Sequence, residues 1–122
     1  MSSVRLIEDT IKELRENQLE KSLRYIRRAR LIYKLKNLQP HLELGYSSFS
    51  HYMRSIFPEI SAPEVSKSHK IIEIFNEFDD KKLAEAGIEK LYILCTRKKG
   101  MSLDAMIEYA KRKNLAEIKA NE

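Results

Sequence analysis

Apolar residues recur along the first third of the chain at steps of three and four residues, the period of an amphipathic helix. One such run is followed, after a five-residue step, by a second: Val4, Ile7, Ile11 and Leu14, then Leu19, Leu23, Ile26, Ala29 and Tyr33. The step falls at Asn17 and Gln18, where a helix either breaks or is locally overwound or bulged. We favour one long helix that ends near Asn37.

The helical period continues after a connection or short helical turn at 38–44, and no strand pattern interrupts it. Helices are expected near 48–57, 62–78, 81–86, 88–98 and 103–114, with Gly, Pro, Ser or Asp residues that stop or cap helices between them. The chain is therefore predicted to be all-α. We expect a compact bundle of five or six helices with a long N-terminal helix, forming a single domain over 1–122.

The stretch 47–78 has the local signals of a helix-turn-helix. Pro58 ends its first helix, and a turn of about three residues follows. Ser61 and Glu64 match a capping box at the start of the second helix, which has Pro63 in its first turn. Two helices joined this tightly are expected to cross steeply.

The second helix of this pair separates an apolar face from a face with small and basic groups. The first face includes Ile71, Ile72 and Phe75 and is expected in the core. The other has four candidate contacts in its first two turns: Ser66, Lys67, His69 and Lys70. This pattern is typical of a recognition helix that enters a DNA major groove by its N-terminal end. The solvated face of an ordinary amphipathic helix explains it equally well, and both interpretations stay open.

The distribution of charge favours a polyanionic partner. The chain has 23 Lys and Arg against 18 Asp and Glu, a net charge of +5, and seven basic residues without an acidic one between Lys21 and Lys36. Within this run Arg24, Arg27 and Arg28 are able to present a ridge to DNA phosphates. The alternative is a charged solvent face that keeps a small protein soluble.

One segment resembles a family. Gly45, Tyr46, Ser48, Phe49 and Tyr52, followed by Ile60 and Ser61, resemble a Gly-Tyr-x-Ser-Phe-x-x-Tyr helix and an Ile-Ser capped helix of bacterial plasmid, phage and mobile-element DNA-binding proteins. The run 83–91 is similar to a Leu-x-x-x-Gly-Ile-x-Lys-Leu element that accompanies it. The resemblance implies that Phe49 and Tyr52 pack the first helix, that Ser61 caps the second, and that exposed positions after Ser61 contact DNA. The chain departs from the family at 62–64, where members have a basic residue and an aromatic one.

No set of residues assembles a catalytic site. His41, His51 and His69 are scattered, Cys95 is the single cysteine and is expected to be a buried structural thiol, and there is no Gly-rich phosphate loop. We therefore expect a protein that is not an enzyme and that needs no metal or small-molecule cofactor. The sequence has no signal-peptide core and no membrane-spanning run, so the expected location is the cytoplasm, without a membrane partner.

These patterns together predict a protein that binds double-stranded DNA, in repression, partition or replication control, with structured RNA still open as a partner. A homodimer through the N-terminal helix is expected, because Ile7, Ile11 and Leu14 extend the apolar stripe beyond what one short helix needs. The alternative function is a helical protein-interaction module or adaptor that does not bind nucleic acid directly.

Overall fold

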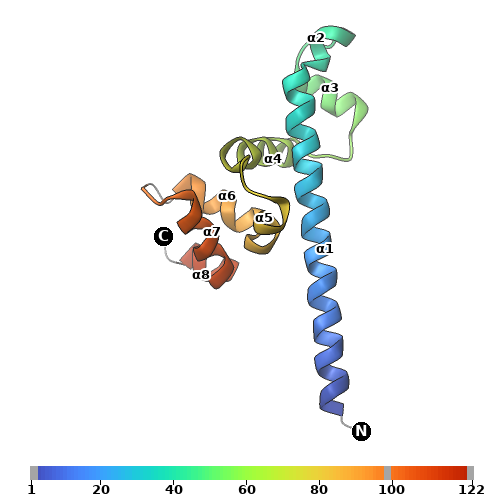
Figure 1. Ribbon diagram of the computed structural model, residues 1–122. Coiled ribbons are helices and arrows are strands. Elements are labelled where there is room, and N and C mark those ends of the chain that lie inside the picture. Colours follow the sequence, from blue (N-terminus) through green and yellow to red (C-terminus); the bar gives the residue numbers. More distant parts are fainter. Residues whose placement is uncertain (1–2, 98–99, 121–122) are drawn as a thin grey trace.

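The long N-terminal helix is continuous. In the computed structural model, which describes residues 3–97 and 100–120, helix α1 runs from Ser3 to Leu38 without a break at Asn17 or Gln18. The five-residue step therefore marks a change of face within one helix. The other helices gather along the C-terminal half of α1, while its N-terminal half projects away from them (Figure 1).

Seven shorter helices follow α1 among the described residues. They are α2 (Pro40–Leu44), α3 (Phe49–Ile56), α4 (Ala62–Phe75), α5 (Asp80–Ala86), α6 (Ile88–Arg97), α7 (Leu103–Arg112) and α8 (Leu115–Ala120). The all-α prediction is confirmed, but the predicted number of five or six helices is wrong. The two additional helices, α2 and α8, have five and six residues, too few to show a helical period in the sequence. None of the described helices combines the length and hydrophobicity that a membrane span requires.

Side-chain caps fix where several helices begin. The hydroxyl oxygens of Ser48, Ser61 and Ser102 accept hydrogen bonds from backbone N–H groups in the first turns of α3, α4 and α7. The carboxylate of Asp79 does the same for α5, at 2.8 Å from the Lys82 nitrogen. These starts confirm the predicted N-cap residues. Of the capping box predicted for α4, the structure shows the bond from the Glu64 backbone to Ser61, whereas the Glu64 carboxylate binds Arg28.

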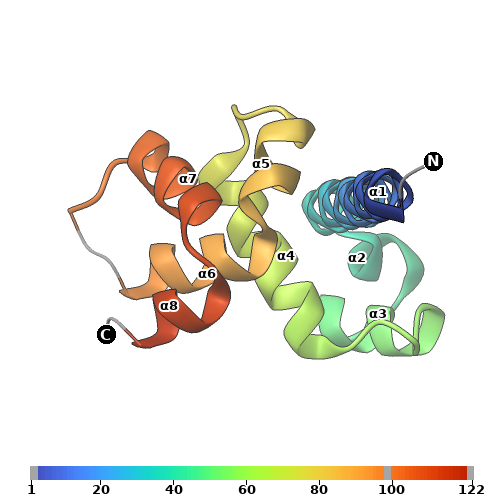
Figure 2. The ribbon, with the colours of Figure 1, turned by 90° about the horizontal axis from the view of Figure 1, so that it is seen from below.

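The core lies where α4 and α5 pack on the C-terminal half of α1. Ile26 of α1, Ile71 and Phe75 of α4, and Leu83 of α5 are each at most 1% exposed. Helices α6, α7 and α8 cover this layer on the side away from α1 (Figure 2). The Lys90 ammonium donates a 2.9 Å hydrogen bond to the Ala110 carbonyl and so ties α6 to α7.

An arginine in the basic run of α1 holds the turn between α4 and α5. Arg30 pairs through Nε with the Asp80 carboxylate and donates through Nη2 to the Phe78 carbonyl at 2.6 Å. The predicted helix 62–78 ends instead at Phe75. Since Arg30 binds the Phe78 carbonyl, the turn after α4 is held to α1 by a contact that local sequence does not reveal.

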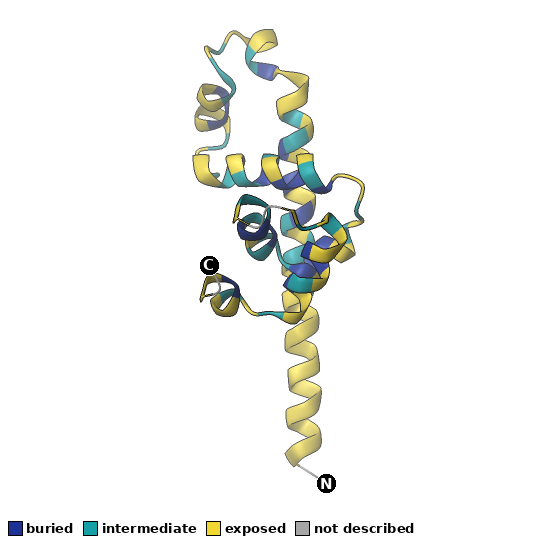
Figure 3. Cartoon of the chain, turned by 90° about the vertical axis from the view of Figure 1, so that its left-hand side faces the viewer, coloured by how far each residue is buried: buried dark blue, intermediate teal, exposed yellow. Residues whose placement is uncertain are grey.

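The N-terminal arm, defined here as residues 3–17 of α1, lies outside this compact part. All its residues are exposed (Figure 3), including four aliphatic side chains: Val4, Leu6, Ile7 and Leu14, at 57–63%. The prediction of a compact bundle is therefore wrong for this part of the chain. Helical periodicity predicted the element correctly but did not reveal that its apolar side chains are exposed.

Candidate nucleic-acid interface

Helices α3 and α4 occupy the segment predicted to form a helix-turn-helix. They are joined by residues 57–61, two more than the expected turn of about three. Helix α3 packs chiefly on α2, whereas α4 packs chiefly on α1 and also on α6. The two helices are therefore placed mainly by contacts with other elements, which local turn signals do not specify.

The outward face of α4 carries two of the predicted contacts. Ser66 and Lys70 are exposed, on the side opposite the buried residues Ile71, Ile72 and Phe75. Glu73 and Glu77 follow along the chain and are also exposed. This face is held firmly in place, because the opposite side of α4 belongs to the core.

Lys67 lies on the flank of α4 that faces α6. Its ammonium is 2.6 Å from Oε1 of Glu89 and 5.4 Å from the centre of the Tyr92 ring. The hydrogen bond with Glu89 raises the pKa of Lys67, so this lysine keeps its proton at neutral pH. Lys70 approaches the same ring at 6.0 Å, and Tyr92 therefore gathers two cations beside α4. This role of Tyr92 was not predicted, because the residue lies in an apolar run.

His69 lies on the opposite flank of α4, against α1. Its ring is 5.0 Å from the Tyr33 ring, and Nδ1 is 3.6 Å from the Glu73 carboxylate. Burial, together with the nearby charge of Lys36, lowers the pKa of His69 below its usual 6.5, although Glu73 opposes this shift. This shift favours the neutral imidazole at pH 7, which is suited to hydrogen bonding rather than to charge neutralisation.

The predicted basic ridge lies on another face of the molecule. Arg24 and Arg27 are exposed. Arg24 lies two positions before the buried Ile26, and Arg27 lies two positions before the buried Ala29. Two positions correspond to about 200° around a helix, so both arginines point away from the core. Arg28 binds the Glu64 carboxylate at 2.9 Å. The structure thus does not bring the ridge together with the outward face of α4. The sequence also gave no sign that Glu64, predicted for a capping box, pairs with an arginine of that ridge.

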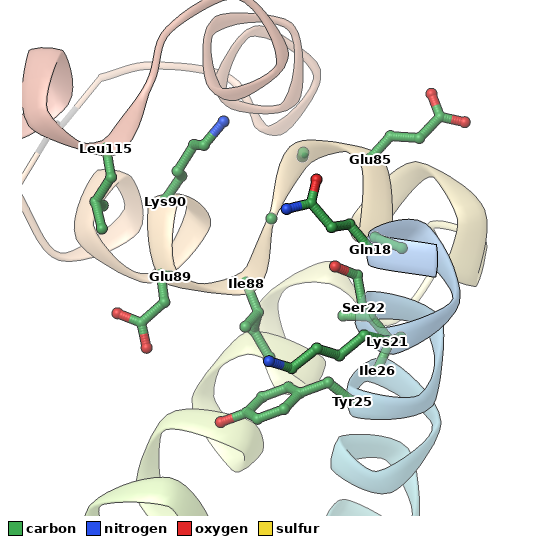
Figure 4. A pocket seen from close by; sticks show the side chains of 13 residues that line it. Gln18, Lys21, Ser22, Tyr25, Ile26, Glu85, Ile88, Glu89, Lys90 and Leu115 are labelled. Atoms are coloured by element: carbon green, nitrogen blue, oxygen red, sulfur yellow. The ribbon is translucent and has the colours of Figure 1, made fainter. Parts of the chain in front are cut away.

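A cleft of about 520 Å³ lies between α1 and the junction of α5 and α6 (Figure 4). Gln18, Ser22 and Tyr25 line it from α1, with Ile88 and Glu89 across from them. Its rim mixes acidic and basic side chains, so its charge does not select one class of ligand. Among the described residues, no three His, Cys, Asp or Glu side chains group as a metal site would require.

Comparison of the chain with protein families, with curated proteins and with solved structures gives no match. The candidate interface is therefore assigned from the chemistry and geometry of this chain alone.

Proposed function

We propose that this protein binds double-stranded DNA without catalysing a reaction, and that α3 and α4 act as a helix-turn-helix with α4 as the recognition helix. The observation that carries the proposal is the exposure of Ser66 and Lys70 on a helix whose other side is buried. A rigid, partly basic helix face of this kind suits contact with base edges and phosphates.

Each predicted residue of α4 has a distinct role in this proposal. Lys70 contacts a phosphate or a guanine, and Ser66 donates a hydrogen bond to a base or phosphate. Lys67 contacts a phosphate at the flank, where the phosphate competes with Glu89 for its ammonium. His69 is neutral and acts as a hydrogen-bonding group at the other flank. The acidic residues that follow on α4 are placed away from the phosphates when the helix enters the groove by its N-terminal end.

The salt dependence of binding separates two forms of this proposal. Contacts from Lys67 and Lys70 alone give a slope of about 2 for the fall of log affinity with log salt. Adding Arg24, Arg27 and Arg28 raises the slope to about 4 or 5. Because the ridge lies on a different face, the steeper slope requires a bent duplex or a ridge supplied by a second copy.

Fluorescence anisotropy with a labelled random-sequence duplex and a matched single strand, from low to moderate salt, tests the proposal. We expect saturable duplex binding, weakened in Lys70→Ala with a salt slope lower by about 1. Lys119→Ala, which removes an exposed lysine from α8, is the control and leaves affinity almost unchanged. Thermal melting of both variants should match the unmodified chain, because neither lysine is buried. Equal affinities for the two variants would refute the assignment of α4.

One observation favours the alternative function, a helical protein-interaction module that does not bind nucleic acid. The N-terminal arm exposes an apolar stripe, and exposed apolar stripes on soluble proteins mark contact with other proteins. Absence of duplex binding at low salt, with the helical fold intact, would select this alternative.

A further inference from the structure

The N-terminal arm is a helical extension of α1 with an exposed apolar stripe, and packing of such a stripe supplies most of the stability of helices in proteins. Val4, Ile7, Ile11 and Leu14 repeat at steps of three and four residues along it, and they are 43–59% exposed. A stripe with this spacing is typical of a helix that packs along another helix.

A second apolar surface lies at the other end of α1. A groove of about 340 Å³, the α1–α3 groove, runs between α1 and the segment from α3 to α4. Leu31, Ile32 and Leu35 line it from α1, and Met53, Phe57 and Ile60 line it from the other side. Leu31 is 66% exposed, so the groove is open to an incoming apolar side chain.

The arm stripe and the groove share one heptad frame. Ile32 follows Val4 by 28 residues, and Leu35 follows Ile7 by the same interval, which is four heptads. Positions separated by whole heptads lie on the same side of a helix that supercoils with another. A straight α-helix drifts by about 80° over four heptads, and a left-handed supercoil of two α1 helices removes this drift and turns both apolar surfaces toward one partner helix.

The charges of α1 specify which helix this is and how it runs. Residues 3–20 have five acidic and three basic side chains, whereas residues 21–38 have seven basic and no acidic ones. A second α1 placed parallel would bring the two basic halves together. Placed antiparallel, it brings each acidic half beside a basic half, and two-fold symmetry makes this contact twice.

We propose that two copies of this chain associate through antiparallel α1 helices, so that the N-terminal arm of each lies in the α1–α3 groove of the other. Ile7 then lies near Ile32 of the second copy, and Val4 near its Leu35. An arm of this length is about 22 Å long, and the two-fold axis makes its contact twice. The arrangement goes beyond the proposed DNA binding and does not depend on it.

Charge reversal tests the arrangement with exposed residues. The arm variant is Glu8→Lys with Glu13→Lys, and the ridge variant is Arg24→Glu with Arg27→Glu. Sedimentation equilibrium of the full chain at low salt, without DNA, measures association. We expect the unmodified chain to be a dimer at tens of micromolar, and each variant alone to dissociate at least tenfold more readily.

An equimolar mixture of the two variants distinguishes this dimer from others. In the mixture, the lysine-substituted arm of the arm variant meets the glutamate-substituted ridge of the ridge variant. The unchanged acidic arm of the ridge variant meets the unchanged basic ridge of the arm variant. We therefore expect the mixture to recover dimers that neither variant forms alone. Two arms that pair with each other would leave the ridge variant dimeric, and that result would overturn the proposal. A monomeric unmodified chain throughout the concentration range would overturn it as well. Lys119→Glu serves as the charge control, and circular dichroism verifies that each variant stays helical.

Discussion

Arg30 is the residue of the basic run whose removal should cost most stability. Within the basic run 21–36, Arg30 contacts the start of α5 through Asp80 and the preceding turn through the Phe78 carbonyl. Its side chain is 28% exposed and that of Asp80 is 32% exposed, so water screens the pair only in part. The perturbation we consider is Arg30→Ala.

The expected magnitude follows from two contacts. A hydrogen bond to a charged group contributes about 1.5–3 kcal/mol when it is shielded from water, and the partial exposure of Arg30 and Asp80 lowers each of the two bonds to about 1 kcal/mol. The two longer contacts with Asn76, both at 3.4 Å, add little. We therefore expect Arg30→Ala to lower the free energy of unfolding by about 2 kcal/mol, or the melting temperature by roughly 6–10 °C.

Urea unfolding followed by circular dichroism measures this loss. Arg27→Ala is the matched control, because Arg27 is an exposed arginine of the same helix for which the described structure records no hydrogen bond or ion pair, and its effect should stay within about 0.5 kcal/mol. Arg30→Lys keeps the charge but not the planar fork, so it should retain part of the stability. If Arg30→Ala and Arg27→Ala unfold at the same urea concentration, the reasoning from these contacts is refuted.

Two further predictions concern His69 and Gly87. An NMR titration should place the pKa of His69 below 6.5. The free energy of unfolding should then fall as pH drops below 6.5, because the unfolded chain takes up a proton that the folded chain does not. His69→Gln should reduce this fall. A pKa above 6.5 would contradict the assigned burial. Gly87→Ala should cost about 1–2 kcal/mol in urea unfolding, because φ is +94° there. The added Cβ itself makes only an ordinary van der Waals contact with the Lys90 side chain, at 3.8 Å, so an unchanged midpoint would show that the backbone relaxes freely.

Local sequence determined where most helices begin and which of their faces are apolar. The caps at Ser48, Ser61, Asp79 and Ser102 were predictable because a side-chain oxygen and a nearby backbone N–H group are neighbours in the chain. The continuity of α1 was favoured for a similar reason, since its residues lack a Pro or Gly that would break the helix.

The partners of charged side chains were decided only by the tertiary structure. Arg28, Arg30 and Lys67 looked alike in sequence as cations for a polyanion, yet each contacts an acidic residue at least 22 positions away. The same distinction holds for apolar residues. Periodicity assigns Ile11 and Ile26 to one helix, but Ile26 is buried and Ile11 is exposed because the other helices pack only on the second half of α1. The sequence of a helix determines which of its sides is apolar. How much of that side other helices cover depends on where distant segments of the chain pack against it.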